Sequence, residues 1–267
     1  SLSLIASSSL TSTVAATSAA ASVSVTPTLP STGSTDLPAP ESNLTLLYVA
    51  VGHGIQNYTC ADDSTATAVN TGALAVLYDV TSLYPGLSST SMSSTSWANM
   101  TSAVLWDQAI PLNLVDPAAG DAVVAKQDDT TYPESSYNAD SADPFPSPAA
   151  ALDLSEDGLS ASYLGHHYFD SESSPTFNLA GAATAGLFFS AKKVGDVAAP
   201  TTADSGLLDT KAVDWLELAD SGRGLSVGIS NVYRVVTAGG GAEACSVSGA
   251  SGNGTFSVPY TAQYWFY

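Results

Sequence analysis

The fold class is decided by two stretches near the end of the sequence, Gly224-Leu-Ser-Val-Gly-Ile-Ser-Asn-Val-Tyr-Arg-Val-Val236 and Phe256-Ser-Val-Pro-Tyr-Thr-Ala-Gln-Tyr-Trp-Phe-Tyr267. If the backbone is extended, alternate apolar residues of the first stretch share one face: Leu225, Val227, Ile229, Tyr233 and Val235. The second stretch does the same with Phe256, Val258, Tyr260, Ala262, Tyr264 and Phe266. Because successive side chains of a strand point to opposite sheet faces, this alternation predicts two half-buried strands.

Two details of the last stretch predict how it sits in the sheet. Pro259 has no N–H to donate to a ladder, so we expect the final strand to lie at a sheet edge or to begin with a bulge there. The chain closes on Tyr264-Trp-Phe-Tyr267, and these rings predict a C-terminus that is docked rather than left in water.

The rest of the chain adds further short strand patterns and little helical periodicity. We expect strands at residues 44–51, 55–60, 73–79, 160–169, 176–179 and 186–194, with a short candidate at 103–106 and a strand or short helical turn at 212–218. Residues 82–100 are rich in Ser and Thr and predict a loop. Residues 107–157 are acidic and proline-rich and predict a long insertion. The expected fold is all-β, a single sandwich or barrel-like domain with long loops over residues 43–267.

Residues 1–42 differ from the rest in composition. Residues 1–35 are mostly Ser, Ala, Thr, Val and Leu, which resembles a mucin-like stalk. Residues 1–5 and 11–14 alternate small polar and apolar side chains, however, and predict an ordered, extended arm followed by a Pro-containing linker. Such an arm lies along its own domain or adds a strand to a neighbouring copy.

The charge balance excludes two classes of partner. The chain holds 6 Lys and Arg against 25 Asp and Glu, a formal net charge of −19. Nucleic acids and anionic lipid surfaces are bound through clusters of basic residues, which this acidic sequence lacks. No run approaches the roughly 18 apolar residues of a membrane span. We therefore expect neither a nucleic-acid nor a membrane partner.

Sequons and cysteines together predict a secreted protein. Acceptor sequons for N-glycosylation begin at Asn43, Asn57, Asn99 and Asn253. The two cysteines, Cys60 and Cys245, are expected to pair in an oxidising compartment; the alternative is two separate buried thiols. The sequence begins without Met or a charged leader, and we expect a signal peptide to have been removed.

Several motifs in order resemble a known family. They include Leu47-Tyr-Val-Ala-Val-Gly-His-Gly-Ile-Gln-Asn-Tyr-Thr-Cys60, Gly165-His-His-Tyr-Phe169, Ala212-Val-Asp-Trp-Leu216 and the closing Val258-Pro-Tyr-Thr-Ala-Gln-Tyr-Trp-Phe-Tyr267. Over about residues 43–267 the chain resembles the secreted fungal and bacterial family catalogued as domain of unknown function 3455. The resemblance implies a secreted β-rich domain found, in fungi, at the cell surface or in the culture fluid, and it implies no activity.

Members of that family sometimes carry a malate dehydrogenase label, which this sequence does not support. Gly52-His53-Gly54 follows a strand pattern, but the third glycine of a dinucleotide fingerprint is replaced by Asn57 and no helix start follows. We expect a tight turn between two strands at this place.

One group of side chains could bind a divalent metal. His166 and His167 are adjacent, so a strand would point them to opposite faces, and one of them could meet His53 and a carboxylate such as Asp170. The alternative, one packed and one solvent-facing histidine, is favoured because no ligand-spacing motif is present. No cofactor is expected beyond such a metal.

The function that these features favour is non-enzymatic. We expect a secreted, glycosylated protein with a structural or interaction role at the fungal cell surface or in the extracellular matrix. Its partners would be other copies of itself, joined into a filament by the N-terminal arm, and cell-wall glycans. The alternative is an extracellular enzyme or carbohydrate-binding module that uses the His/acid site or exposed Trp side chains.

Overall fold

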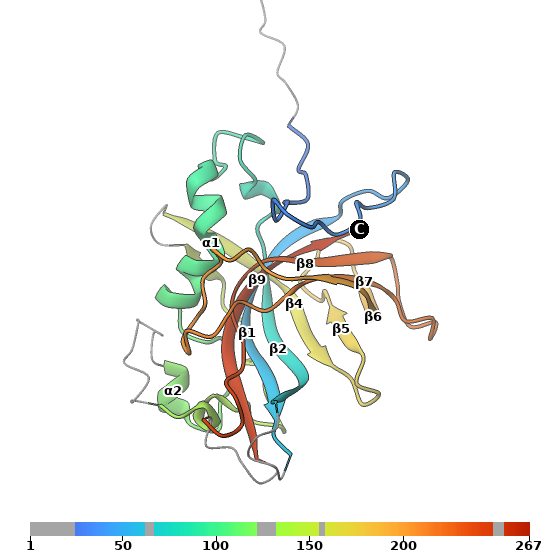
Figure 1. The fold of residues 1–267 in the computed structure, drawn as a ribbon. Coiled ribbons are helices and arrows are strands. Elements are labelled where there is room, and N and C mark those ends of the chain that lie inside the picture. The colour runs from blue at the N-terminus through green and yellow to red at the C-terminus, as the bar shows by residue number, and fades with distance from the viewer. Residues whose placement is uncertain (1–24, 62–66, 122–131, 155–157, 248–253) are drawn as a thin grey trace, which may run out of the picture.

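The computed structural model of the protein describes residues 25–61, 67–121, 132–154, 158–247 and 254–267. Within these residues the dominant elements are antiparallel strands (Figure 1). Their bounds are Tyr48–Thr59 (β1), Val69–Asp79 (β2), Leu152–Leu154 (β3), Leu159–Phe169 (β4), Pro175–Asn178 (β5), Phe188–Val197 (β6), Trp215–Asp220 (β7), Asn231–Gly239 (β8) and Thr255–Phe266 (β9).

The strands form a closed barrel. Their order is β2-β1-β9-β8-β7-β6-β5-β4, and β2 also pairs with β4, which closes the sheet into an eight-stranded antiparallel barrel. The short strand β3 pairs with β4 outside this closure. The all-β prediction is therefore confirmed, and of its two architectures the barrel is the one found.

Strand β9 runs through the middle of the sheet and is buried on both faces. Tyr260, Ala262, Tyr264 and Phe266 fill the barrel interior, whereas Trp265 belongs to a second core outside the barrel. The predicted docking of the C-terminus is confirmed, but the predicted edge position is wrong because β9 lies between β1 and β8. Pro259 is tolerated because the β8 ladder ends opposite Tyr260, so only β1 pairs with the strand there.

The stretch 224–236 is not one strand. Strand β8 begins at Asn231, and the exposed Leu225 and Val227 lie in the loop before it. Within β8, Val232 faces the interior core while Tyr233 and Val235 face the outer one. The prediction of one apolar face for this stretch is wrong, because both faces of β8 are covered by other parts of the protein.

Residues 48–59 form one continuous strand, so the predicted turn at Gly52-His53-Gly54 is wrong. The glycines serve close packing instead. A Cβ on Gly52 would lie 2.6 Å from the Tyr264 ring, and one on Gly54 would lie 2.0 Å from the Leu74 carbonyl oxygen. Neighbouring strands and rings therefore occupy the space that larger side chains would need.

A helix replaces the loop and short strand expected at residues 82–106. Helix α1 spans Ser94–Asp107, and the Ser93 side chain caps it by accepting from the Ser96 N–H at 3.0 Å. Its buried residues, Trp97, Met100, Thr101, Val104 and Leu105, recur at the helical spacing of three and four. This face packs on the outside of the barrel, chiefly on β9 and β8.

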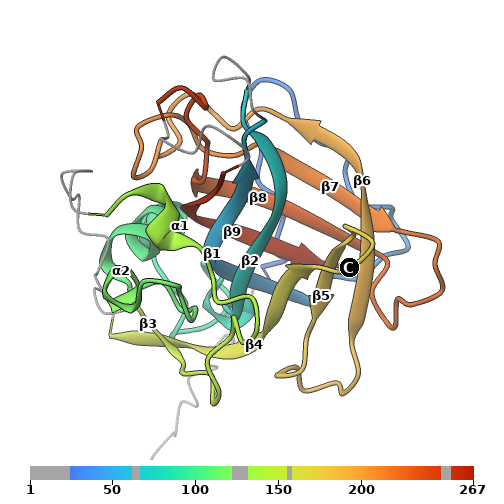
Figure 2. The same cartoon turned by 90° about the horizontal axis from the view of Figure 1, so that it is seen from below.

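Three shorter helical segments complete the described fold: η1 (Thr81–Leu83), α2 (Pro117–Asp121) and η2 (Glu134–Tyr137). Figures 1 and 2 both place α1 and α2 on the same flank of the barrel, away from β5, β6 and β7. Much of the acidic insertion thus covers the outer core. No helix in the described ranges has the length and apolar character needed to cross a bilayer.

The part of the N-terminal arm that the structure describes lies on its own domain. Leu29 and Leu37 pack against the outer core, and the Thr28 N–H donates to the Tyr84 hydroxyl at 3.3 Å. Residues 1–24 lie outside the described residues, so the predicted arm strands at 1–5 and 11–14 stay predictions.

Candidate functional site

A cavity of about 660 Å³ opens where β1 and β4 end and where β2 and β5 begin. Every strand of the barrel contributes to its wall: Gln56 (β1), Asn70 (β2), His167 (β4), Pro175 (β5), Ala191 (β6), Leu218 (β7), Arg234 (β8) and Tyr264 (β9). Its size is that of pockets that hold small organic ligands. Mouths of eight-stranded barrels are a common place for such ligands.

The charge around this cavity is opposite to that of the protein. Of the six Lys and Arg residues in the sequence, four line it: Lys192, Lys193, Lys211 and Arg234. Asp214 is the one carboxylate among its described lining residues, so the lining carries four positive charges against one negative. In a chain with a net charge of −19, this concentration of cations creates a local field that attracts anions.

Arg234 is the buried member of this set. Its side chain is 9% exposed, and Nε and Nη2 donate to the Asp214 main-chain carbonyl at 3.2 and 2.8 Å. Ion pairs in the described residues join Lys193 to Asp196, Lys211 to Asp214 and Arg223 to Asp170, and none of them includes Arg234. A buried guanidinium without a carboxylate is costly, because its lost hydration is not repaid by an opposite charge.

Two tyrosine hydroxyls and the Gln56 amide add buried polar groups near Arg234. The Tyr260 and Tyr264 hydroxyl oxygens lie 2.7 Å apart, and both side chains are fully buried. Burial raises the pKa of Tyr264, and the nearby Arg234 charge opposes that rise. The Gln56 Oε1 accepts from the Asn70 amide at 3.1 Å, whereas the buried Gln56 Nε2 has no hydrogen-bond partner of normal geometry.

His167 supplies a neutral acceptor on the opposite part of the wall. Its ring stacks on Phe177 with centroids 4.2 Å apart, and its Nδ1 lies 3.0 Å from the Thr176 carbonyl oxygen. Since a carbonyl oxygen can only accept, Nδ1 carries the proton and Nε2 keeps its lone pair. Burial, together with the nearby Arg234 charge, lowers the pKa of His167 to about 4, so the ring is neutral at pH 7.

The candidate metal residues are not brought together. His53 points away from the barrel interior, where its ring nitrogens contact Thr261 Oγ1 at 3.1 Å and the Gln108 carbonyl at 3.3 Å. His166 lies on the same outer face, one strand beyond Val76, and stacks on Phe145 with centroids 3.9 Å apart. His167 faces the interior. In the described ranges no three His, Cys, Asp or Glu residues are grouped to hold a metal.

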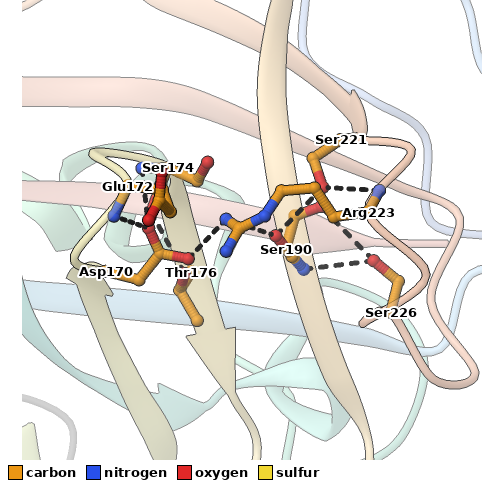
Figure 3. Close-up of polar contacts among 8 residues, drawn as sticks. All are labelled: Asp170, Glu172, Ser174, Thr176, Ser190, Ser221, Arg223 and Ser226. Atoms are coloured by element: carbon orange, nitrogen blue, oxygen red, sulfur yellow. Dashed lines mark hydrogen bonds and ion pairs between the residues drawn. The ribbon is translucent and has the colours of Figure 1, made fainter.

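Asp170, the fourth candidate metal ligand, forms an ion pair and hydrogen bonds with other groups. Figure 3 shows its carboxylate between the Arg223 guanidinium, 2.6 Å away, and the main-chain N–H groups of Glu172 and Ser174, at 2.9 and 3.0 Å. The hydrogen bond from Arg223 and those from the main chain lower the pKa of Asp170. This network connects the β4–β5 turn to the loop after β7. The metal hypothesis is therefore corrected, because the structure does not group His53, His166, His167 and Asp170 around one point.

The buried imidazoles predict an acid-labile fold. Burial lowers the pKa of His53 and His167 to about 4, below the unfolded value of about 6.5. The unfolded state therefore binds more protons between these values, and each histidine should remove about 2 kcal/mol from the free energy of unfolding between pH 6.5 and 4.5. Burial and the nearby Glu243 raise the pKa of Glu134 to about 8, which acts in the opposite direction over the same window.

Urea unfolding at pH 6.5 and 4.5 separates these contributions. The variant His167→Gln should lose less stability on acidification than the wild type, and Glu134→Gln should lose more. If His167→Gln shows the wild-type dependence on pH, the buried ring is not the group that titrates.

The cysteines and sequons fall in three different environments. Cys60 and Cys245 form a disulfide with a Cα–Cα distance of 5.7 Å, which confirms the predicted pairing. Asn43 and Asn99 are exposed, whereas Asn57 is half-buried in β1 and its Oδ1 accepts from Ser257 at 2.9 Å. Asn253 lies outside the described residues. Glycosylation at these positions stays a prediction.

Residues 40–267 match the family described as "Protein of unknown function (DUF3455)". The chain belongs to this family. Comparison of this DUF3455 protein with curated proteins and with solved structures found no match. The family carries no established activity, so the function has to be argued from the cavity itself.

Sequence reasoning named His167 as a metal ligand only and missed the other cavity residues of this DUF3455 domain, although one signal was present. Arg234 interrupts the apolar run of Val232, Tyr233, Val235 and Val236 in a chain with few cations. A lone charge in a buried strand is rarely retained without a partner or a role. Gln56 gave no comparable signal, because polar residues in short strands commonly face solvent.

Proposed function

We propose that this DUF3455 protein is a secreted binding protein that takes up a small anionic molecule in the end of its barrel. The observation that carries the proposal is Arg234, a buried cation without a carboxylate partner in a cavity to which every strand contributes. The exposed Lys192, Lys193 and Lys211 at the mouth would raise the local concentration of anions. The formed disulfide and the exposed sequons at Asn43 and Asn99 support the secreted setting.

This is an interaction role rather than a catalytic one. The alternative of a carbohydrate-binding module is less well supported, because the tryptophans do not form an exposed platform. Trp97, Trp215 and Trp265 are buried, and the half-buried Trp106 donates to Asp204 at 2.7 Å. Association of copies into a filament through residues 1–35 stays a prediction, as does binding of cell-wall glycans.

The variant Arg234→Met tests the proposal. It keeps an apolar stem of similar length and removes the charge, so it should abolish binding of anions while the fold is kept. A bound ligand raises the free energy of unfolding by RT ln(1 + [L]/Kd), which is about 2.7 kcal/mol when the ligand concentration is a hundred times Kd. Thermal unfolding of the full chain with sodium benzoate, inorganic phosphate and glucose, each over a range of concentrations, would show the effect.

At least one of the two anions should raise the Tm of the wild type, glucose should not, and Arg234→Met should lose the response. Arg223→Met is the matched control, because it removes the arginine of the Asp170 ion pair, which is not among the residues that line the cavity. Equal responses of Arg234→Met and the wild type to the anions would contradict the proposal, and a response to glucose alone would favour the carbohydrate alternative.

A further inference from the structure

The anion that fits this cavity can be narrowed to one chemical class. Resting on the proposed function, we infer that the ligand is an organic acid with a single carboxylate and an apolar body, bound with its carboxylate on Arg234. Three features of the cavity carry this: the guanidinium edge without a carboxylate partner, the count of buried charges and the chemistry of the remaining wall.

The orientation of Arg234 leaves one edge of its guanidinium without a carboxylate partner. Nε and Nη2 together use one edge of the planar group on the Asp214 carbonyl. Arg234 also hydrogen-bonds the Tyr264 hydroxyl, and no carboxylate of the described residues pairs with the edge formed by Nη1 and Nη2. Two parallel N–H groups at this edge match the two oxygens of a carboxylate, which is planar as the guanidinium is.

The charge count favours a monoanion. Arg234 is the one buried cation among the described lining residues, since Lys192, Lys193 and Lys211 are exposed at the mouth. One buried positive charge balances one carboxylate, whereas a phosphate dianion would leave a buried negative charge uncompensated. Phosphates are also commonly held by arrays of free main-chain N–H groups at helix N-termini, and here the wall consists mainly of strands, whose N–H groups serve the ladders.

The rest of the wall suits an apolar body with a further polar group. Val213, Leu216, Leu218 and Phe169 line the cavity as apolar surface. The Gln56 and Asn70 side chains and the His167 ring add polar groups to the same wall. A fully apolar fatty tail would cover these polar groups without pairing with them, so a ring or short chain with one more oxygen fits the cavity better.

The test compares three probes that share one ring and differ in the head group: benzoate, phenyl phosphate and benzyl alcohol. Each is titrated into the ¹⁵N-labelled full chain at pH 7, and amide chemical shifts give dissociation constants even when they are millimolar. Benzoate should bind at least tenfold more tightly than either of the other probes. Arg234→Met should lose that preference, and Arg223→Met should keep it.

Arg234→Lys separates the planar fork from the charge. Lysine keeps one positive charge without the two parallel donors, so the preference for benzoate over phenyl phosphate should fall by severalfold. Amide spectra of each variant without ligand show whether it is folded. If Arg234→Met is unfolded, Arg234→Lys carries the test.

The outcomes distinguish this inference from the proposed function. If phenyl phosphate binds more tightly than benzoate and Arg234→Met abolishes the binding, the cavity takes anions but the carboxylate class is wrong. If benzyl alcohol binds as tightly as benzoate and the variants change nothing, both the inference and the proposed function are wrong. Full benzoate preference in Arg234→Lys would likewise overturn the planar pairing.

Discussion

Replacing both cysteines, with Cys60→Ala and Cys245→Ala in one chain, is expected to lower the free energy of unfolding by about 3–5 kcal/mol. The disulfide joins residues 185 positions apart, so it restricts the unfolded chain over most of its length. It also belongs to a small core with Tyr58, Phe256 and Val258, which ties the end of β1 to the start of β9. The double variant therefore loses both the constraint and the packing.

Guanidinium chloride unfolding of the double variant, the wild type and the reduced wild type would measure this loss. Free energies have to be compared rather than midpoints, because an unfolded chain without the cross-link exposes more surface and the denaturant slope rises. The reduced wild type should resemble the double variant. Equal free energies for the oxidised wild type and the double variant would show that the bond adds nothing to stability.

The all-β class was predictable because it depends on local alternation, which is visible in the sequence, but the choice between sandwich and barrel was not. The even-numbered residues of β9 do face one side, as the pattern predicts. The pattern could not predict that the odd-numbered face of β9 is also covered. Thr261, Gln263 and Trp265 on that face are buried as well. The helix α1, which covers the outer face, was missed for two reasons. Its first turn is rich in Ser and Thr and resembles a loop, and the helical pattern of Trp97, Met100 and Val104 extends over only a few turns.

The cavity was not predictable, because it forms only when the sheet closes. Gln56, His167 and Arg234 lie on β1, β4 and β8, and no local motif links them. Closure depends on pairing between β2 and β4, which are separated in the sequence by the acidic insertion. The histidines illustrate the limit well. Adjacency correctly placed His166 and His167 on opposite faces, but only the closed barrel shows which of them faces a cavity.

The barrel also depends on a close approach of β1 and β2, which a single added methyl group should prevent. The variant Gly54→Ala would place a Cβ 2.0 Å from the Leu74 carbonyl oxygen and 2.7 Å from the Ala75 Cα, and both of these are main-chain atoms of β2. A side chain could rotate away, but here the two strands must separate. We expect the free energy of unfolding to fall by about 3 kcal/mol or more, at the upper end for overpacking.

Gly195→Ala is the matched control for this prediction. It also adds one methyl group to a barrel strand, but its Cβ would meet the Glu217 side chain at 3.4 Å and Leu37 at 3.7 Å, which are ordinary contacts. Its free energy of unfolding should change by less than about 1 kcal/mol. Urea unfolding of the two variants with the wild type measures the difference, and equal stability of Gly54→Ala and Gly195→Ala would contradict the close approach of β1 and β2. Because Gly54 lies two residues before Gln56 on β1, a folded Gly54→Ala chain should also bind benzoate more weakly, since separating these strands displaces one wall of the cavity.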